Sequence, residues 1–369
     1  MPELNALAAK VLAAAFCLSF VFGAIAQRTH FCTMGALSDA WNMGDTNRLR
    51  QWALAAGVAI LGFWTLAALG QVDPAKTLYS ASRWIWLSAA VGGALFGFGM
   101  VLASGCGSKN LLRMGGGSLK ALVVVVVLGV SAFATLKGIT AVARVATVDQ
   151  VGVDFAAPAL LPMALANVSG WSLPLAGMLA ALVLGGGLVA WALARRDFRN
   201  FDNLLAGLGL GAVIVGAWWV SGHLGHLAEH PETLEEAFLA TNSGRAEALS
   251  FVSPVAYALD WLMFFSDKSK LLTVGIVSVA GVVLGSAAVS LLGRSFRWEG
   301  FGGTEDVGNH LVGGVLMGVG GVTAMGCTIG QGMSGISTLS ATSFVAVAGI
   351  AGGAILAFQY QLWRLERGA

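Results

Sequence analysis

Three cysteines stand where glycine-rich or polar residues interrupt the apolar segments of the chain. Cys32 follows the polar stretch RTHF, Cys106 ends the segment GGALFGFGMVLASGC, and Cys327 ends the segment GGVLMGVGGVTAMGC. A protonated thiol is a weak hydrogen-bond donor, a thiolate is a soft metal ligand, and thiols can also exchange sulfur covalently. These residues therefore allow three chemistries, namely weak anion binding, soft-metal binding and sulfur transfer.

The two glycine-rich segments are copies of one motif. Gly92–Cys106 aligns with Gly313–Cys327 without a gap, at a constant shift of 221 residues, which is 327 minus 106. A duplicated half with a reactive side chain at the same place in each copy suggests a transport path between the halves. The spacing of glycines at Gly93 and Gly97, and at Gly314 and Gly318, also predicts close helix packing in lipid.

Further glycines follow both cysteines and predict broken helices. Non-helical backbone at membrane depth is tolerated only where it is buried in protein or lines a watery cavity. We therefore expect each Gly-Cys pair to end a span and to be followed by a short re-entrant helix whose N–H groups favour an anion. The candidate path residues are Cys32, Cys106, Cys327, Gly105, Gly326, Thr328, Gln331, His30, Lys109 and Arg113.

Several of these side chains have an alternative interpretation. Lys109 and Arg113 follow Cys106, whereas the matching positions after Cys327 are Gly330 and Ser334. The two cations either face the path or anchor the span on the cytoplasmic side. Thr328 and Gln331 would act as uncharged donors, and His30 could orient an anion or tune Cys32.

The composition identifies the solvent in which these elements fold. With 57% hydrophobic residues, 11% charged residues and a mean hydropathy of +0.78, the chain has too little polar surface for a water-soluble body of 369 residues. We expect an all-α polytopic membrane protein. About nine spans are expected, at roughly 6–26, 51–70, 84–104, 118–137, 171–194, 203–222, 270–293, 307–326 and 338–362.

Positive charge follows each odd-numbered span. The residues concerned are Arg28, Arg48, Arg50, Lys109, Arg113, Arg195, Arg196, Arg199, Arg294, Arg297, Arg364 and Arg367. The positive-inside rule then places the amino terminus outside and the carboxy terminus in the cytoplasm. The connections 139–169 and 225–250 should lie outside, where they could cap the entrance or meet a partner.

This topology makes the repeat an inverted one. The first Gly-Cys copy ends the third span and the second ends the eighth, and an odd offset of five reverses the direction across the membrane. We expect a single membrane transport domain, 1–369, with a 4+1+4 arrangement. Residues 1–138 would form the first inverted repeat, 139–200 an outer segment and a connector helix, and 201–369 the second inverted repeat.

Other cysteine and histidine residues receive simpler interpretations. Cys17 lies in the middle of the first span, where a thiol is usually a small buried hydrophobic group. His223, His226 and His230 have helical spacing near Glu229, which leaves open either a solvated face or a metal site.

At the two Gly-Cys copies, at the extension GCTIGQGMSGISTLS and at Cys32, the chain resembles the YeeE/YedE membrane proteins, some of which import thiosulfate into bacteria. The resemblance covers most of the chain. It implies an hourglass of helices in the bacterial inner membrane, in which Cys32, Cys106 and Cys327 pass thiosulfate inward by weak thiol hydrogen bonds. A small cytoplasmic sulfur-carrier protein of the TusA type would be a separate chain. Some relatives concern selenium or other sulfur compounds.

Two other functions remain open from the residues. The cysteines with Met34, Met100, Met114 and Met325 could carry a soft cation, although intramembrane carboxylates are nearly absent and the charges beside Cys106 are positive. A membrane redox subunit could instead use the thiols for persulfide exchange. No nucleotide-binding motif is present, and we expect no enzymatic activity, no cofactor, no bound metal and no nucleic acid partner.

Overall fold

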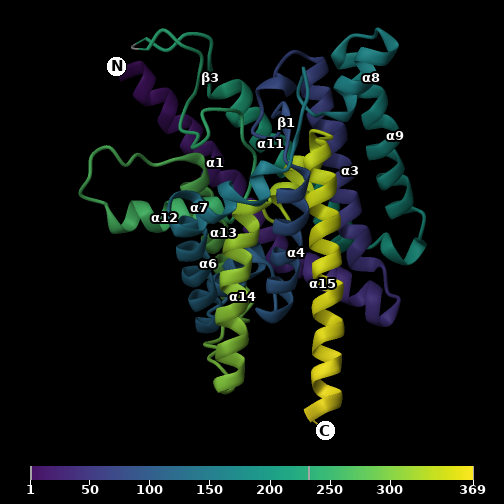
Figure 1. Cartoon of the computed structure of the whole chain (residues 1–369), viewed down its shortest axis with the longest axis vertical. Helices are drawn as coiled ribbons and strands as arrows, with labels where there is room; N and C mark the ends of the chain where they lie inside the picture. The colour runs from purple at the N-terminus through teal and green to yellow at the C-terminus, as the bar shows by residue number, and fades with distance from the viewer. Residues whose placement is uncertain (1, 232, 369) are drawn as a thin grey trace.

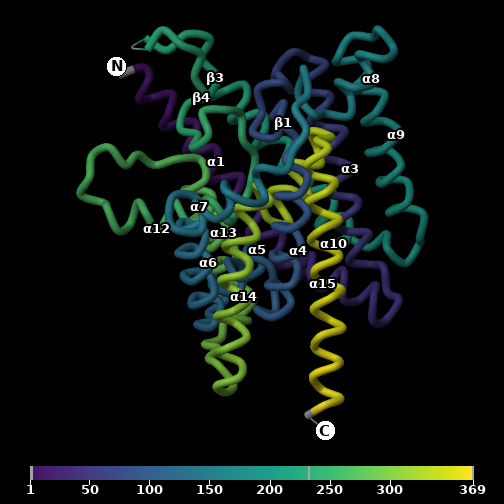
Figure 2. Tube along the Cα trace, viewed as in Figure 1, coloured from purple at the N-terminus to yellow at the C-terminus, as the bar shows by residue number. Residues whose placement is uncertain are grey.

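A computed structural model describes residues 2–231 and 233–368, and long helices that run along a common direction dominate it (Figure 1). The two ends of the chain lie at opposite ends of the bundle (Figure 2). The long helices are α1 (Pro2–Arg28), α3 (Asn47–Ala68), α4 (Trp86–Leu102), α6 (Leu119–Lys137), α9 (Leu173–Leu193), α11 (Leu210–Trp219), α13 (Val274–Leu292), α14 (Thr304–Thr323) and α15 (Ala341–Gly368).

Eight helical segments in the described residues are long and apolar enough to cross a membrane. One of them, Phe201–Leu224, joins α10 (Phe201–Leu204), η5 (Leu205–Gly209), α11 and η6 (Val220–Leu224) without a break. The span expected at 307–326 is helix α14, which begins with Glu305 and Asp306 in its first turn and is not among these eight. The chain is an all-α polytopic membrane protein, as its composition predicts.

Short helices follow the three breaks in the long ones. Cys32 precedes α2 (Thr33–Ser38), which continues into η1 (Asp39–Met43). Cys106 precedes α5 (Gly107–Gly115), and Cys327 lies shortly before the π-helical turn η7 (Gly330–Gly335). The sequence prediction that short helices follow Cys106 and Cys327 is confirmed.

Glycines allow the helices around the breaks to approach closely. A Cβ atom added at Gly97 would lie 2.0 Å from the carbonyl oxygen of Ile350 on α15, and one at Gly318 would lie 2.5 Å from the carbonyl oxygen of Leu128 on α6. Where α4 crosses α14, Gly99 meets Gly313, and each added Cβ would lie within 2.7 Å of the other residue's carbonyl oxygen. The predicted glycine packing is therefore confirmed.

The connections between the long helices contain the remaining elements, of which α8 lies at the same end of the bundle as the amino terminus and α7 and α12 lie near its middle (Figure 1). They are η2 (Pro74–Lys76), β1 (Arg83–Trp84), α7 (Ile139–Ala146), η3 (Val148–Gln150), β2 (Val153–Asp154), α8 (Leu161–Ser169), β3 (His226–Leu227), β4 (Ala237–Phe238) and α12 (Ser253–Met263), whereas η4 (Arg196–Phe198) lies between α9 and α10. The only sheets among the described residues are the two-stranded pairs β1–β2 and β3–β4.

Two of these connections reach the interior next to the break at Cys327. The backbone N–H of Leu161 donates to the carbonyl of Leu339 at 3.0 Å, and that of Ala341 donates to the carbonyl of Ala159 at the same distance. The 246–252 segment, which precedes α12, is largely buried, with Phe251 and Val252 both fully covered. These long connections therefore help to hold the residues around η7.

Candidate functional site

The break at Cys106 is a tight, internally braced turn. Ser104 has φ of 55°, a left-handed conformation that side-chain-bearing residues rarely adopt. The side-chain amide of Asn110 donates to the carbonyls of Gly105 and Cys106 at 2.8 and 3.1 Å. The thiol of Cys106 is 1% exposed and lies 3.2 Å from the hydroxyl oxygen of Ser108. The turn thus fixes a buried thiol at the amino terminus of α5.

The break at Cys327 repeats this geometry with different side chains. Met325 has φ of 58°, and Gly326 has φ of 159°, the same value as Gly105. Gln331, which is 221 residues after Asn110, donates from its side-chain amide to the carbonyl of Ala324 at 2.6 Å. Two copies of the motif therefore fold into the same turn, each braced by one amide side chain.

The second thiol is enclosed more fully than the first. Cys327 is 0% exposed, and its sulfur accepts the backbone N–H of Gly330 at 3.4 Å. The backbone of Phe251, from the 246–252 segment, also contacts this thiol. The hydroxyl of Tyr79 donates to the carbonyl of Gly330 at 2.6 Å, and burial raises the pKa of Tyr79, so the phenol stays protonated and able to donate.

The third thiol begins α2. Cys32 is 9% exposed, and its sulfur accepts the backbone N–H of Gly35 at 3.3 Å. A Cβ added at Gly35 would lie 2.6 Å from Nη1 of Arg48 and 3.6 Å from the Cys32 sulfur, so the guanidinium and the thiol both border this glycine. Arg48 also forms an ion pair with Asp39 at 3.4 Å.

Lys109 is the cation that lies near both Cys32 and Cys106. Its side chain lies within electrostatic range of both Cys32 and Cys106, and its stem lies over Gly105, where an added Cβ would be 3.0 Å from its Cγ. Cys106 lies within the same kind of range of Cys32 and of Cys327. The three thiols therefore lie near one another as one series, with Cys106 between the other two and positive charge at the Cys32 side.

The other predicted residues have different surroundings. Arg113 donates to the carbonyl of Ser104 at 3.3 Å but pairs with Glu299 at 3.4 Å, so it is bound outside the thiol series. Gln331 uses its amide oxygen as well, accepting from the hydroxyl of Ser343 at 2.6 Å, so both of its polar atoms contact the turn and its role as a donor on the path stays a prediction. His30 has φ of 52° and is exposed, with no ring contact to a cysteine in the part of the chain that the structure describes.

Thr328 is the predicted donor that stays uncommitted. Its hydroxyl is buried and has no hydrogen-bond partner among the described residues, and the same holds for Thr33 and for the indole nitrogen of Trp52. All three residues border one cavity of about 220 Å³ between α2, α3 and α15. Thr33 and Thr328 each follow a cysteine, so two unused hydroxyls accompany the thiol series.

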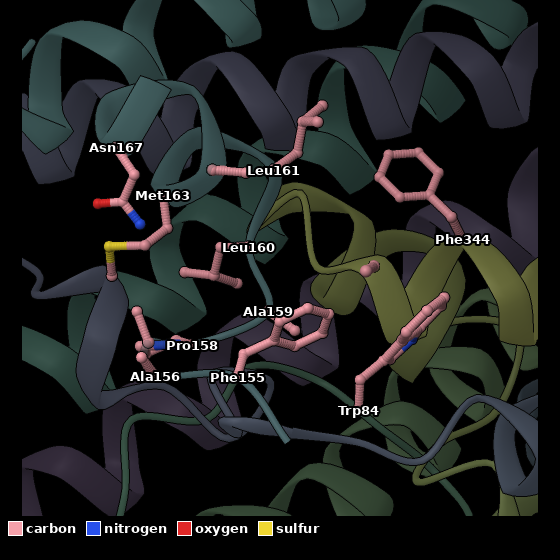
Figure 3. A pocket seen from close by; sticks show the side chains of 13 residues that line it. Trp84, Phe155, Ala156, Pro158, Ala159, Leu160, Leu161, Met163, Asn167 and Phe344 are labelled. Atoms are coloured by element: carbon pink, nitrogen blue, oxygen red, sulfur yellow. The ribbon is translucent and has the colours of Figure 1, made fainter. Parts of the chain in front are cut away.

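A larger cavity lies elsewhere. It has a volume of about 600 Å³ and is lined mainly by apolar side chains of the 155–164 segment, with Trp84 and Phe344 on the opposite wall (Figure 3). Asn167 is the one amide side chain in its lining. Such a surface suits a hydrocarbon chain better than a small anion, and none of the predicted path residues borders it.

Cys17 and the histidines of the 223–230 segment lie away from the three buried thiols. Cys17 is exposed on α1, so the expectation that it is buried is wrong. His226 bonds to Glu236 at 2.6 Å, and the ring of His223 lies against Trp219. Within residues 2–231 and 233–368, no group of three or more metal-ligating side chains comes together.

A bundle of membrane-crossing helices that is interrupted at three buried thiols suits a transport protein of the membrane. The chain belongs to the sulphur transport family of YeeE/YedE proteins, whose profile matches residues 28–356. That match includes all three thiols of the series.

Individual relatives agree with this membership. The chain is 25% identical over 317 residues to the thiosulfate transporter TsuA of Escherichia coli K12, covering 85% of this chain and 84% of that protein. It is 25% identical over 343 residues to TsuA of Spirochaeta thermophila, covering 89% and 92%. A shorter match, 33% identical over 92 residues, joins 25% of the chain to 21% of the probable transporter YedE of Escherichia coli K12.

Proposed function

We propose that this protein imports thiosulfate, or a closely related small sulfur anion, by passing it along Cys327, Cys106 and Cys32. The observation that carries the proposal is the connected series of three buried thiols, each fixed at a helix break, with Lys109 beside two of them. The two thiosulfate transporters to which the chain is similar along most of its length support the choice of substrate.

The chemistry of the thiols suits such an ion. A dianion needs donors that replace its water in several weak steps, strong enough for uptake and loose enough for release. A neutral thiol is a weak donor, and the unused hydroxyls of Thr33 and Thr328 could add to it. Soft sulfur opposite the terminal sulfur of thiosulfate would favour this ion over sulfate.

The positive charges argue against a soft cation as the substrate. Lys109 interacts with Cys32 and Cys106, and Arg48 lies at Gly35 beside Cys32. A cation such as Cu(I) would be repelled by both groups, whereas an anion leaving the last thiol would be attracted. The charges therefore support anion transport from the Cys327 side toward the Cys32 side.

The proposed direction agrees with the expected topology. The amino terminus would lie outside and the carboxy terminus in the cytoplasm of a bacterial inner membrane. Residues 1–138 and 201–369 would be inverted repeats joined by 139–200, which is supported by the shared turn geometry of Ser104 with Met325 and of Gly105 with Gly326. A separate sulfur carrier of the TusA type would receive the ion in the cytoplasm.

Uptake of labelled thiosulfate tests the proposal, in a bacterium that lacks its own thiosulfate and sulfate importers. The parent chain should restore uptake, and Cys106→Ala and Cys327→Ala should abolish it at equal membrane abundance, whereas Cys17→Ala should behave like the parent because that thiol lies outside the series. Serine variants separate the mechanisms, because a hydroxyl keeps a donor but cannot form a persulfide. A parent chain that restores no uptake would contradict the proposal.

A further inference from the structure

A short strap closes the bundle at the end where the carboxy terminus lies. We call residues 295–299, between α13 and α14, the inner strap. Its backbone is bonded to the turn between α5 and α6: the N–H of Arg297 donates to the carbonyl of Gly116 at 3.1 Å, and the N–H of Leu119 donates to the carbonyl of Glu299 at 2.9 Å. Gly117, with φ of 99°, permits this approach, because a Cβ there would lie 2.5 Å from the carbonyl oxygen of Arg297.

Beneath the inner strap is a polar cavity of about 360 Å³. It is lined by Gln27, Arg113, Gly116, Ser118, Ser295, Arg297, Trp298 and Glu299. The two guanidinium groups and the hydroxyl of Ser118 offer polar contacts, the amide of Gln27 and the hydroxyl of Ser295 already donate to Ser290, and one carboxylate is the only anionic group in the lining. Planar guanidinium groups with nearby hydroxyls are the donors that oxyanions prefer in proteins.

The single carboxylate binds one of the two guanidinium groups of this cavity, and it also binds a lysine that lies outside the lining. Glu299 accepts from Lys120 at 2.7 Å and from Arg113 at 3.4 Å. The hydrogen bond from Lys120 and the charge of Arg113 lower the pKa of Glu299, so this side chain stays ionised near neutral pH. The ionised carboxylate of Glu299 thus occupies a position next to the cationic group that could bind a substrate anion.

The same guanidinium reaches the turn that precedes the middle thiol. Arg113 donates to the carbonyl of Ser104 at 3.3 Å, and Ser104 is the left-handed residue two positions before Cys106. Arg113 therefore borders both the turn that fixes the middle thiol and the polar cavity under the inner strap. An anion that leaves the thiols on this side meets a cation already bound by a carboxylate.

We infer that the polar cavity is an exit site for a divalent oxyanion. Glu299 competes with this ion for Arg113, and the ion is released when the ion pair between Glu299 and Arg113 forms again. The inference rests on the proposed function, of which it is the last step. A cation left without a competitor would hold a dianion tightly and slow its departure, whereas transport needs each site to bind weakly enough to let go.

The variant Glu299→Gln tests the competition because it keeps the size of the side chain and removes its charge. Thiosulfate uptake by this variant should show both a lower apparent KM and a lower maximal rate than the parent, each by about threefold, which is the effect of a partly exposed ion pair. Purified Glu299→Gln protein in detergent should also bind labelled thiosulfate and sulfate about threefold more tightly than the parent. Glu299→Asp, which keeps the charge, should restore much of the parent's behaviour.

Glu305→Gln is the matched control. Glu305 pairs with Arg364 at 2.6 Å on the first turn of α14 and does not line the cavity, so its loss should leave both kinetic constants and anion binding unchanged. If the inner strap were only a structural clamp, Glu299→Gln would lower the maximal rate without lowering KM or tightening binding, and this result would overturn the inference. The binding measurement needs no transport, so it decides the role of Glu299 even if the parent imports no thiosulfate, which would contradict only the proposed function.

Discussion

The contact between α4 and α15 gives a prediction whose size follows from the structure. A Cβ atom added at Gly97 would lie 2.0 Å from the carbonyl oxygen of Ile350, and ordinary contacts begin at 3.4 Å. The helices would have to separate by 3.4 minus 2.0, or 1.4 Å, because the obstructing atom belongs to backbone and cannot rotate away. Overpacking of this kind costs about 1–3 kcal/mol, and we expect Gly97→Ala to fall near the upper limit.

Gly352→Ala is the matched control. Gly352 lies on α15, the helix that α4 contacts at Gly97, but an added Cβ at Gly352 has nothing within 4 Å. Alanine should be neutral there or stabilising by up to about 1 kcal/mol, since glycine weakens a helix. The assay is the thermal midpoint of each detergent-solubilised protein, with labelled thiosulfate uptake as the second readout because α4 leads into Cys106. Equal midpoints for the two variants would refute the reasoning, since they would show that the helices are not in contact at Gly97.

Three further predictions concern single side chains near the thiols. Lys109→Gln should raise the KM for thiosulfate uptake about tenfold because it removes a charged partner, whereas Lys109→Arg should keep most of the uptake; an unchanged KM for the glutamine variant would place Lys109 off the path. Tyr79→Phe should lower the free energy of unfolding by about 1–2 kcal/mol, because the buried carbonyl of Gly330 loses its 2.6 Å donor; thermal melts would measure this, and no change would contradict the bond. Burial raises the pKa of Glu247 above 4.5, so its contribution to stability is complete below the unfolded pKa and is lost as pH rises through the folded pKa. Melts of Glu247→Gln from acidic to neutral pH should therefore depend less on pH than those of the parent, and parallel curves would refute this assignment.

The sequence predicts the fold well because hydropathy and glycine spacing report directly on burial in a membrane. Composition indicates an all-α polytopic protein, and glycines such as Gly97 and Gly318 mark the close helix contacts. The breaks at Cys106 and Cys327 are also predictable, because non-helical backbone at this depth requires residues such as Gly105 and Gly326.

The surroundings of individual side chains were less predictable. The sequence gives Lys109 and Arg113 equal weight, but only Lys109 interacts with two thiols, because the partner of Arg113, Glu299, lies 186 residues away in the chain. Arg48 and Tyr79 were missed for a related reason, since each reaches the thiol region from another helix or connection. Side-chain direction depends on tertiary contacts that periodicity does not contain.

Gln331 shows a different limit. Its residue type and position suggested a donor on the path, yet both of its polar atoms serve the turn, one toward Ala324 and one toward Ser343. The equivalent residue, Asn110, could have been recognised as a brace from the 221-residue shift alone, because an amide recurs at this position in both copies of the motif. An aligned pair of amides next to a glycine turn is thus a signal for a structural role.

Because one thiol is exposed and three are buried, chemical labelling of the cysteines can follow motions of the chain. Cys17 faces outward on α1, whereas Cys32, Cys106 and Cys327 are buried. In a Cys17→Ala background, a maleimide reagent added from one side of the membrane can modify a cysteine only when that thiol becomes accessible. The order in which the three thiols react, with and without substrate, would then record how far the path opens from each side during a transport cycle.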